Sequence, residues 1–276
     1  MPMRIAHTTD FSTHSAVAYE HALALALAAR GRLDILHVRP PGRAHEWQSF
    51  PHVRETLGRW GLISAHDGPQ HIEGKLGLRI AKVEIDHADP GAGLSQFFLG
   101  HRPDLLVLSA HGLDGVDRWV HASVSEDVIR RTHIPTLLLG PHARCLVAPD
   151  TGRVRLVRVL MPVVSEPAPA QALHLMEDLF MRLGLRDVAV HLMQVVGPGQ
   201  APLEDLLDAR GTTRPVAHYA GDNIIESILA VAENWEADVI AMPTFTHRGI
   251  AHALRGSTTS HVVARATCPV LTLPMV

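Results

Sequence analysis

Short apolar runs alternate with longer helical segments along the chain. Leu105–Leu108 is continuously apolar, which is typical of a strand buried on both faces of a sheet. The Ala- and Leu-rich segment Thr13–Arg30 predicts a helix that ends at Gly31. Strands that alternate with helices favour a parallel, doubly wound α/β sheet. In the first half we expect strands at Arg4–Thr9, Leu33–Val38, Leu78–Asp86, Asp104–Ser109 and Thr136–Leu139.

The second half repeats this pattern. Asp104–Pro141 recurs at Asp238–Met275 with a constant offset of 134 residues (238 − 104) and no gap. The matches include Asp104 with Asp238, Gly115 with Gly249, Ser123 with Ser257, Arg131 with Arg265 and Leu137 with Leu271. Further strands are expected at Arg158–Val163, Asp187–Val195, Val216–Tyr219, Val239–Met242 and Val270–Leu273.

The repeat predicts two domains, residues 1–142 and 154–276, joined by a linker at Gly140–Gly152. Each domain is expected to hold one five-stranded sheet, and the pair to show pseudo-two-fold symmetry. The connectors between the second and third strands are harder to interpret. A helix pattern in Glu46–Ser64 is interrupted by Gly58, and a helical turn is expected at Leu203–Leu207.

Composition narrows the class of protein. The net charge of −3, with both signs interspersed, argues against a nucleic-acid or polybasic membrane surface. No apolar run has the roughly 18 residues of a membrane span, and no signal segment opens the chain, so a cytoplasmic location is expected. Two cysteines provide no disulfide framework. The 20 histidines form no HExxH motif, and we assign no metal site.

A loop that leads from a parallel strand into a helix is a natural phosphate site, because unpaired N–H groups and the helix dipole point at the anion. Ligands of such sheets bind beyond the carboxyl ends of the strands, where strand order reverses. If the first and fourth strands flank that point, the crevice gathers Asp10, Val38, Ser109–Gly112 and Ala122–Ser125.

Three stretches together resemble the universal stress protein family in its tandem form. The opening IAHTTDFSTHSAVAYEHAL is similar to the family's first strand with its terminal Asp. The family's motif of Gly, two residues, Gly, nine residues and Gly-Ser corresponds here to Ser109, Gly112 and Ala122-Ser123. Ile-Pro-Thr and Cys-Pro-Val precede or open the last strand of each half.

This resemblance implies a Rossmann-like fold of the adenine nucleotide alpha hydrolase-like type. It also implies a site for ATP or ADP, with Mg²⁺, in which the Asp lies by the adenosine and the helix start holds the phosphates. Family members pair through their last strands, so Thr136–Leu139 and Val270–Leu273 should pair within the chain, and a homodimer is a further option. The implied nucleotide-binding residues are Thr8, Thr9, Asp10, Val38, Ser109, His111, Gly112, Ala122, Ser123, Val124 and Ser125.

The two halves depart unequally from the family motif. Ser109 and Ala122 replace glycines in the first half, and these side chains accept close ligand approach less readily. In the second half Pro243 and Thr246 replace both loop glycines, and Val164 replaces the Asp. The second half retains a helix start that a bare anion could use, at Gly256, Ser257, Thr258 and Thr259.

Three functions stay open at this point. The first is a non-catalytic nucleotide-binding module of the stress response, with an unidentified protein partner. The others are a nucleotide-independent interaction protein and a slow ATPase; no nucleophile–base pair or phosphate-loop lysine motif nominates an enzyme. Asp10 could also cap the first helix, although Ser12 is the better cap. His37 and His191, 154 residues apart, are expected at equivalent strand positions, as packing groups.

Overall fold

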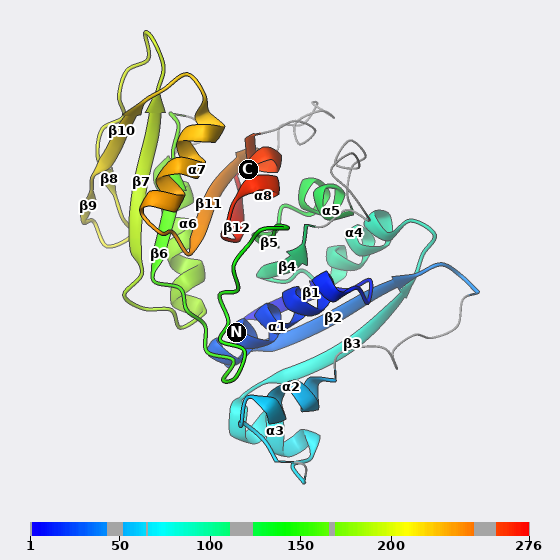
Figure 1. Cartoon of the computed structure of the whole chain (residues 1–276). Helices are drawn as coiled ribbons and strands as arrows, with labels where there is room; N and C mark the ends of the chain where they lie inside the picture. The colour runs from blue at the N-terminus through cyan, green and yellow to red at the C-terminus, as the bar shows by residue number, and fades with distance from the viewer. Residues whose placement is uncertain are drawn as a thin grey trace.

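The computed structural model describes residues 2–42, 52–64, 66–110, 124–165, 169–245 and 258–275. Its described strands form one ten-stranded sheet in the order β10-β7-β6-β11-β12-β5-β4-β1-β2-β3, together with a separate two-stranded β8–β9 sheet (Figure 1). The first half contributes β1 (Arg4–Thr8), β2 (Arg32–Arg39), β3 (Arg79–Asp86), β4 (Leu105–Ser109) and β5 (Thr136–Leu139). The second contributes β6 (Arg158–Pro162), β7 (Ala189–Val196), β8 (Leu206–Leu207), β9 (Thr213–Arg214), β10 (Val216–Ala220), β11 (Val239–Phe245) and β12 (Val270–Met275).

The strands within each half of the large sheet are parallel, as the alternating sequence pattern predicts. The halves meet at one antiparallel pair, β5 with β12, in which Leu137 lies opposite Leu271. These two leucines are also matched by the 134-residue repeat, so the pseudo-two-fold axis passes between them. The predicted pairing of the last strands is therefore confirmed, and it joins the two expected sheets into one.

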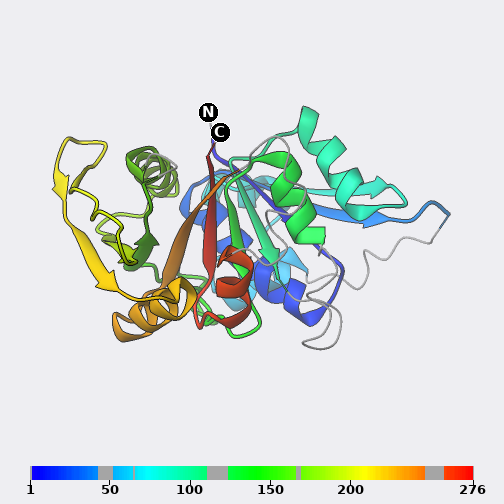
Figure 2. The ribbon, with the colours of Figure 1, turned by 90° about the horizontal axis from the view of Figure 1, so that it is seen from above.

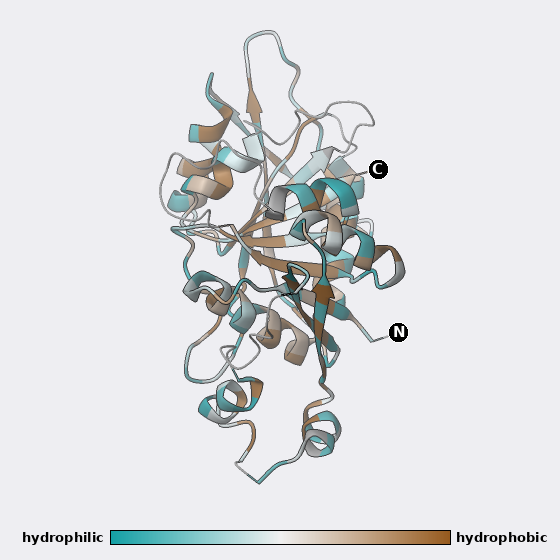
Figure 3. Cartoon of the chain, turned by 90° about the vertical axis from the view of Figure 1, so that its right-hand side faces the viewer, coloured by the Kyte–Doolittle hydropathy of each residue, from teal (hydrophilic) through white to brown (hydrophobic). Residues whose placement is uncertain are grey.

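Helices cover both faces of the sheet (Figure 2). One core lies beneath α1, α2, α3 and α6, and the other lies beneath α4, α5, α7 and α8. Apolar strands run through the middle, between helices whose surfaces are more polar (Figure 3). The described helices are α1 (Thr13–Ala28), α2 (Val53–Arg59), α3 (Pro69–Leu76), α4 (Pro90–Gly100), α5 (Val124–Thr132), α6 (Pro169–Arg182), α7 (Ile224–Asn234) and α8 (Thr258–Arg265).

The connection between the halves is anchored on both sides. Leu146 is buried, and its N–H donates to Nε2 of the buried His21 in α1 at 2.9 Å. The indole N–H of Trp60, which follows α2, donates to Pro149 O at 3.1 Å. Arg144 reaches the second half, where its backbone N–H donates to Thr267 O at 2.9 Å. Residues 144–149 thus form hydrogen bonds with both halves of the chain.

Gly152 provides a test of this anchoring. Its φ is +65°, and a Cβ placed there would lie 2.3 Å from Cε3 of Trp60. We expect Gly152→Ala to lower the free energy of unfolding by about 2 kcal/mol, because left-handed strain and overpacking add. Urea denaturation measures this change. Gly199→Ala is the matched control, since Gly199 has φ +77° and a Cβ placed there would meet no atom within 4 Å, so it should show the strain alone. Equal losses in the two variants would contradict a role for Trp60.

Two local expectations need correction, and one helix was not expected. Leu203–Leu207 contains no helical turn; Leu206 and Leu207 form β8, which pairs with β9 across a turn at Gly211. The helix expected in Glu46–Ser64 is the shorter α2, within the described part of that stretch, and α3 was not predicted. α3 begins with a proline and ends at Gly77 with φ +67°, which are ordinary helix boundaries that the glycine-rich sequence obscures.

Candidate functional site

The carboxyl end of β1 lies at the reversal of strand order in the first half. β1 pairs with β2 on one side and β4 on the other, so the expectation about the flanking strands is confirmed. Thr9 continues the ladder by donating its N–H to Leu36 O at 2.8 Å. Thr8 pairs with Leu36, so if this register is continued by two residues Asp10 lies level with Val38. On the other side His7 pairs with Val107, so Ser109 lies level with Thr9. Three strand ends carrying predicted site residues are therefore neighbours.

Asp10 is exposed and held in place by the turn that follows it. Its Oδ1 accepts hydrogen bonds from Ser12 N–H at 3.0 Å and from Ser12 Oγ at 2.6 Å. Ser12 in turn caps α1, since its Oγ accepts from Ser15 N–H at 3.2 Å. Within the described residues, Oδ2 of Asp10 takes part in no hydrogen bond. The prediction that Ser12, and not Asp10, is the N-cap of α1 is confirmed.

Phe11 supports this turn in a left-handed conformation, with φ 63°. Its ring lies against the His37 imidazole, with 4.3 Å between the ring centroids. The Nδ1 of His37 donates to Thr9 O at 2.9 Å, which ties β2 to the residue before Asp10. Positive φ is uncommon for a bulky residue and costs free energy that neighbouring contacts must offset. The contacts of Phe11 and His37 therefore help to maintain the orientation of Asp10.

A buried polar network lies beneath the turn. His7 is fully buried, and its Nδ1 donates to Val107 O at 2.9 Å. Its Nε2 lies 3.4 Å from Ser15 Oγ, which lies 2.8 Å from Thr9 Oγ1. Burial lowers the pKa of His7 to about 4, while the bond to Val107 and the charge of Asp10 oppose that shift. The imidazole is therefore neutral at pH 7.

Sequence reasoning missed this network. His7 lies in β1 and Thr9 follows the strand directly, so the two side chains lie on the same face, and Ser15 lies in the first turn of α1. That spacing was the available signal. The spacing indicates a hydrogen-bond network only once β1 and α1 are known to pack on each other.

Val38 forms an apolar wall beside Asp10. Its side chain faces α4, where a Cβ added at Gly93 would lie 3.4 Å from Val38 Cγ1. A Cβ at Gly91, near the start of the same helix, would lie 2.5 Å from Asp127 Oδ2 of α5. The glycines of α4 thus allow that helix to approach both β2 and α5 closely. Val124 and Ser125 are the first residues of α5.

The remaining predicted residues of this site, His111, Gly112, Ala122 and Ser123, lie outside the described residues. The structure places Thr8, Thr9, Asp10, Val38 and Ser109 together at adjacent strand ends. It does not describe the loop that would complete the site.

The corresponding position in the second half has different chemistry. Val163 N–H donates to Met193 O at 2.8 Å, as Thr9 does to Leu36 O, so Val164 stands where Asp10 stands. Val164 is 52% exposed and has no carboxylate to offer a ligand. β11 also continues to Phe245, which pairs with Met275, whereas β4 ends at Ser109. Ala110, which follows β4, still donates its N–H to Leu139 O at 2.8 Å, and the next residue of the first half lies outside the described ranges.

Of the second-half anion residues, Thr258 and Thr259 open α8, and Thr259 is buried at 8% exposure. Gly256 and Ser257 are not among the described residues.

The expected equivalence of His37 and His191 is wrong. Thr8 pairs with Leu36, and Pro162 pairs with Met193, so Gln194 is the residue that matches His37. The second half has three more residues between its first two strands, since Arg4 pairs with Arg32 (28 apart) and Arg158 with Ala189 (31 apart). His191 instead contacts Tyr219, with 3.0 Å between Nε2 and the hydroxyl oxygen.

No group of three or more His, Cys, Asp or Glu side chains in the described ranges could hold a metal ion. Among the helices that the structure describes, none combines the length and apolar character that crossing a bilayer demands.

Comparison with known proteins identifies relatives across the whole chain. Residues 1–140 and 142–274 each match the sequence model of the universal stress protein family. A universal stress protein from Archaeoglobus fulgidus is similar in structure, with a TM-score of 0.64, 17% identity, and 98% of this chain and 96% of that chain covered. A putative universal stress protein from Pseudomonas aeruginosa gives a TM-score of 0.60 at 12% identity, covering 98% and 92%. Curated protein sequences gave no significant match.

Proposed function

Because the chain belongs to the universal stress protein family, we propose that its first half binds an adenine nucleotide, ATP or ADP with Mg²⁺. The protein then acts as a stress-response binding module with little or no turnover. The observation that carries this proposal is the exposed Asp10 carboxylate, held by Ser12 at the strand-order reversal. Ligands of open parallel sheets bind at that position.

The residues at this edge suit the parts of a nucleotide in different ways. A carboxylate accepts hydrogen bonds from hydroxyl groups, so Asp10 suits the ribose of the ligand. Val38 provides apolar surface for the base. The start of α5, at Val124, would offer the N–H groups of the first helical turn and the positive end of the helix dipole to phosphate. Because Asp10 and phosphate repel each other, we assign the carboxylate to the adenosine end.

We expect Asp10→Ala to weaken ATP binding at least tenfold, because a hydrogen bond to a charged group contributes about 1.5–3 kcal/mol. Isothermal titration with ATP, ADP and AMP, each with Mg²⁺, measures the affinities. Asp10→Asn keeps an oxygen acceptor for Ser12 but removes the charge and replaces the second carboxylate oxygen by an NH2 donor, so it separates ligand contact from support of the turn. Val164→Ala is the matched control in the second half and should leave the affinity unchanged. Absence of both binding heat and thermal stabilisation at millimolar nucleotide would refute the proposal.

A second candidate function is a nucleotide-independent interaction protein of the same fold. The observation that favours it is the second half, which presents Val164 in place of the carboxylate and extends β11 to Phe245. The second half has thus kept the fold without the carboxylate of the site. Chromatography of the supernatant after denaturing freshly purified protein decides between the two functions, because a stoichiometric adenine nucleotide would exclude nucleotide independence.

A further inference from the structure

The hydrogen bond between α1 and the connection (residues 144–149) fixes the tautomer and the charge of a buried imidazole. The N–H of Leu146 can only donate, so Nε2 of His21 is the acceptor, at 2.9 Å. Val17 O can only accept, so Nδ1 of His21 donates to it, at 2.8 Å. The side chain of His21 is 1% exposed. The imidazole therefore carries one proton, on Nδ1, and is neutral.

The other hydrogen bonds of the connection do not depend on pH in this way. In the described residues they are formed by backbone groups, by the indole N–H of Trp60 and by the guanidinium group of Arg144. Neither of these side chains changes its protonation near neutral or mildly acidic pH. Among the described hydrogen bonds of residues 144–149, the one to His21 is therefore the one that a proton can remove.

The groups around His21 act on its protonation in opposite directions. Burial lowers the pKa of His21, and its backbone hydrogen bond and the charge of Glu20 oppose that shift. Glu20 is the preceding residue of α1, and its Oε1 lies 2.5 Å from Nη2 of Arg59, the last residue of α2. The carboxylate is thus already paired. Burial outweighs it, and the neutral imidazole is retained at pH 7.

Titratable groups on the other elements that contact α1 or the connection leave this picture unchanged. Cys145 of the connection stays a neutral thiol at pH 7 and below, because burial raises its pKa. On β1, His7 contacts Ser15, six residues before His21 and so more than one turn away along α1. The strands beneath α1 contribute apolar residues to the core that surrounds it.

The second half has no counterpart of His21. Arg30 and Gly184 follow α1 and α6, both with positive φ, and they lie 154 residues apart (184 − 30). The same offset places Leu175 at the position of His21. Leu175 packs against the core, so an apolar side chain is sufficient for this position in the helix. The imidazole occurs in the half whose first helix holds the connection.

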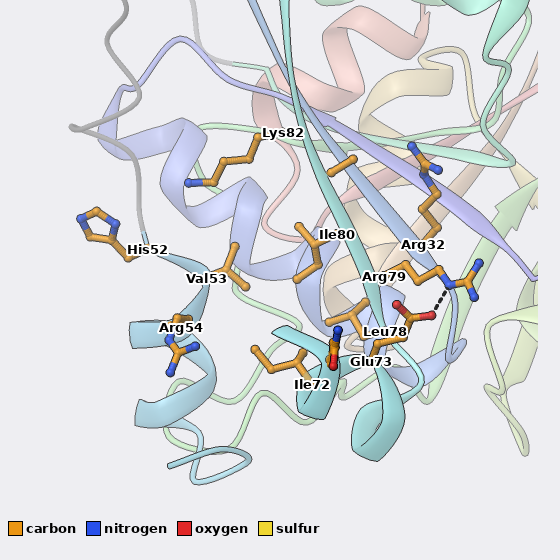
Figure 4. Close-up of a pocket in the computed structure, with 12 residues that line it drawn as sticks. Arg32, His52, Val53, Arg54, Ile72, Glu73, Leu78, Arg79, Ile80 and Lys82 are labelled. Atoms are coloured by element: carbon orange, nitrogen blue, oxygen red, sulfur yellow. Dashed lines mark hydrogen bonds and ion pairs between the residues drawn. The ribbon is translucent and has the colours of Figure 1, made fainter. Parts of the chain in front are cut away.

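The other anchor of the connection in the first half is on a less closely packed part of the fold. Trp60, which donates to Pro149 O, follows α2. A cavity of about 670 Å³ lies between α2, α3 and β3, and its lining includes Val53, Ile72 and Ile80 (Figure 4). α1, in contrast, packs directly on β1 and β4. His21 is therefore the anchor on the more firmly supported helix.

We propose that the hydrogen bond between His21 and Leu146 is a pH-sensitive anchor, which acid opens to release residues 144–149 from α1. Protonation of Nε2 places two donors face to face, because an imidazolium has no acceptor. A buried N–H without a partner is costly, so the backbone at Leu146 moves away from the ring. The paired positions of β5 and β12 hold no titratable side chain, so the two halves stay joined.

The pH window follows from the protonation of the closed and open states. In the open state His21 regains an ordinary pKa near 6.5, whereas in the closed state burial keeps its pKa lower. The anchor is therefore fully stable above pH 6.5 and weakens as the pH falls below it. If the closed state binds no proton, linkage makes opening about 30-fold more favourable at pH 5.0 than at pH 7.5.

Hydrogen exchange of the Leu146 amide in the full chain, followed by NMR, tests this proposal. The quantity compared is the protection factor, the intrinsic exchange rate divided by the measured rate, so that the pH dependence of the exchange chemistry cancels. We expect the protection factor of Leu146 to fall at least fivefold between pH 7.5 and pH 5.0. A protection factor that is the same at both pH values would overturn the proposal.

Two variants at position 21 separate protonation from a general loss of stability in acid. His21→Gln keeps an acceptor oxygen for Leu146 but does not titrate, so its protection factor should change less than twofold over the same range. His21→Asn has a shorter side chain that still reaches Val17 O but not Leu146, so protection should already be low at pH 7.5. Both variants keep His7, so its contribution to acid sensitivity is common to all three chains. A fall in His21→Gln equal to that of the parent chain would contradict the anchor.

The ring itself gives a readout that does not depend on any variant. Nitrogen NMR of the His21 imidazole should show the Nδ1–H tautomer at pH 7.5 and a change to imidazolium over the pH range in which Leu146 loses protection. An Nε2–H tautomer at pH 7.5 would refute the proposed acceptor. No nucleotide is present in these measurements, so their failure leaves the proposed function standing, and the reverse also holds.

Discussion

Replacement of Leu271 by aspartate is expected to lower the free energy of unfolding by about 4 kcal/mol or more. Leu271 is 2% exposed and lies opposite Leu137, which is 5% exposed, at the only place where the two halves share strand hydrogen bonds in the described sheet. A carboxylate there would be buried in an apolar core without a partner. Such a loss is a large share of the roughly 5–15 kcal/mol that stabilises a typical domain. Urea denaturation followed by circular dichroism measures it.

Two controls separate the effect of a buried charge from a general disturbance of the β5–β12 pair. Leu271→Met retains the volume and apolar character and should cost less than about 1.5 kcal/mol. Leu137→Asp should cost about as much as Leu271→Asp, because the pseudo-two-fold axis makes the two positions equivalent. An aspartate at position 271 that leaves stability within about 1 kcal/mol of the parent chain would contradict the buried β5–β12 pair.

The second large effect concerns pH. In the unfolded chain His7 titrates near 6.5, whereas burial lowers its pKa to about 4 in the folded chain. Above pH 6.5 both states are neutral and stability does not depend on this group. As the pH falls from about 6.5 towards 4, the unfolded chain binds a proton that the folded chain does not. The free energy of unfolding should therefore decrease, by about 3 kcal/mol over the whole window and about 2 kcal/mol by pH 5.

Urea denaturation between pH 7.5 and pH 5.0 checks this pH dependence in the parent chain and in His7→Asn. The asparagine side chain can still donate to Val107 O but does not titrate, so the variant should lose less stability on acidification than the parent. His21→Asn is a useful companion, because burial also lowers the pKa of His21, so this variant too should show a shallower pH dependence. If His7→Asn has the same pH dependence as the parent chain, His7 is not the neutral buried group described above.

The predictable parts of the fold depend on strong local patterns. The alternation of apolar runs and helices identified the strands of the large sheet, and the constant offset of 134 correctly aligned β4, β5, β11 and β12. The Asp10–Ser12 turn was also predictable, because its hydrogen bonds join residues two apart. The connectors were not, since glycines weaken their helix signal and the short β8–β9 pair has little pattern of its own.

The sequence by itself determined that this chain is a tandem repeat, that its strands are parallel within each half, and that Asp10 has no counterpart at Val164. Only the tertiary structure decided what depends on contacts between distant residues. These are the His7–Ser15–Thr9 network, the match of His37 with Gln194, and the register that places Leu137 opposite Leu271. The reason is that register and loop length set which distant side chains meet, and three extra residues between two strands are enough to change the partner.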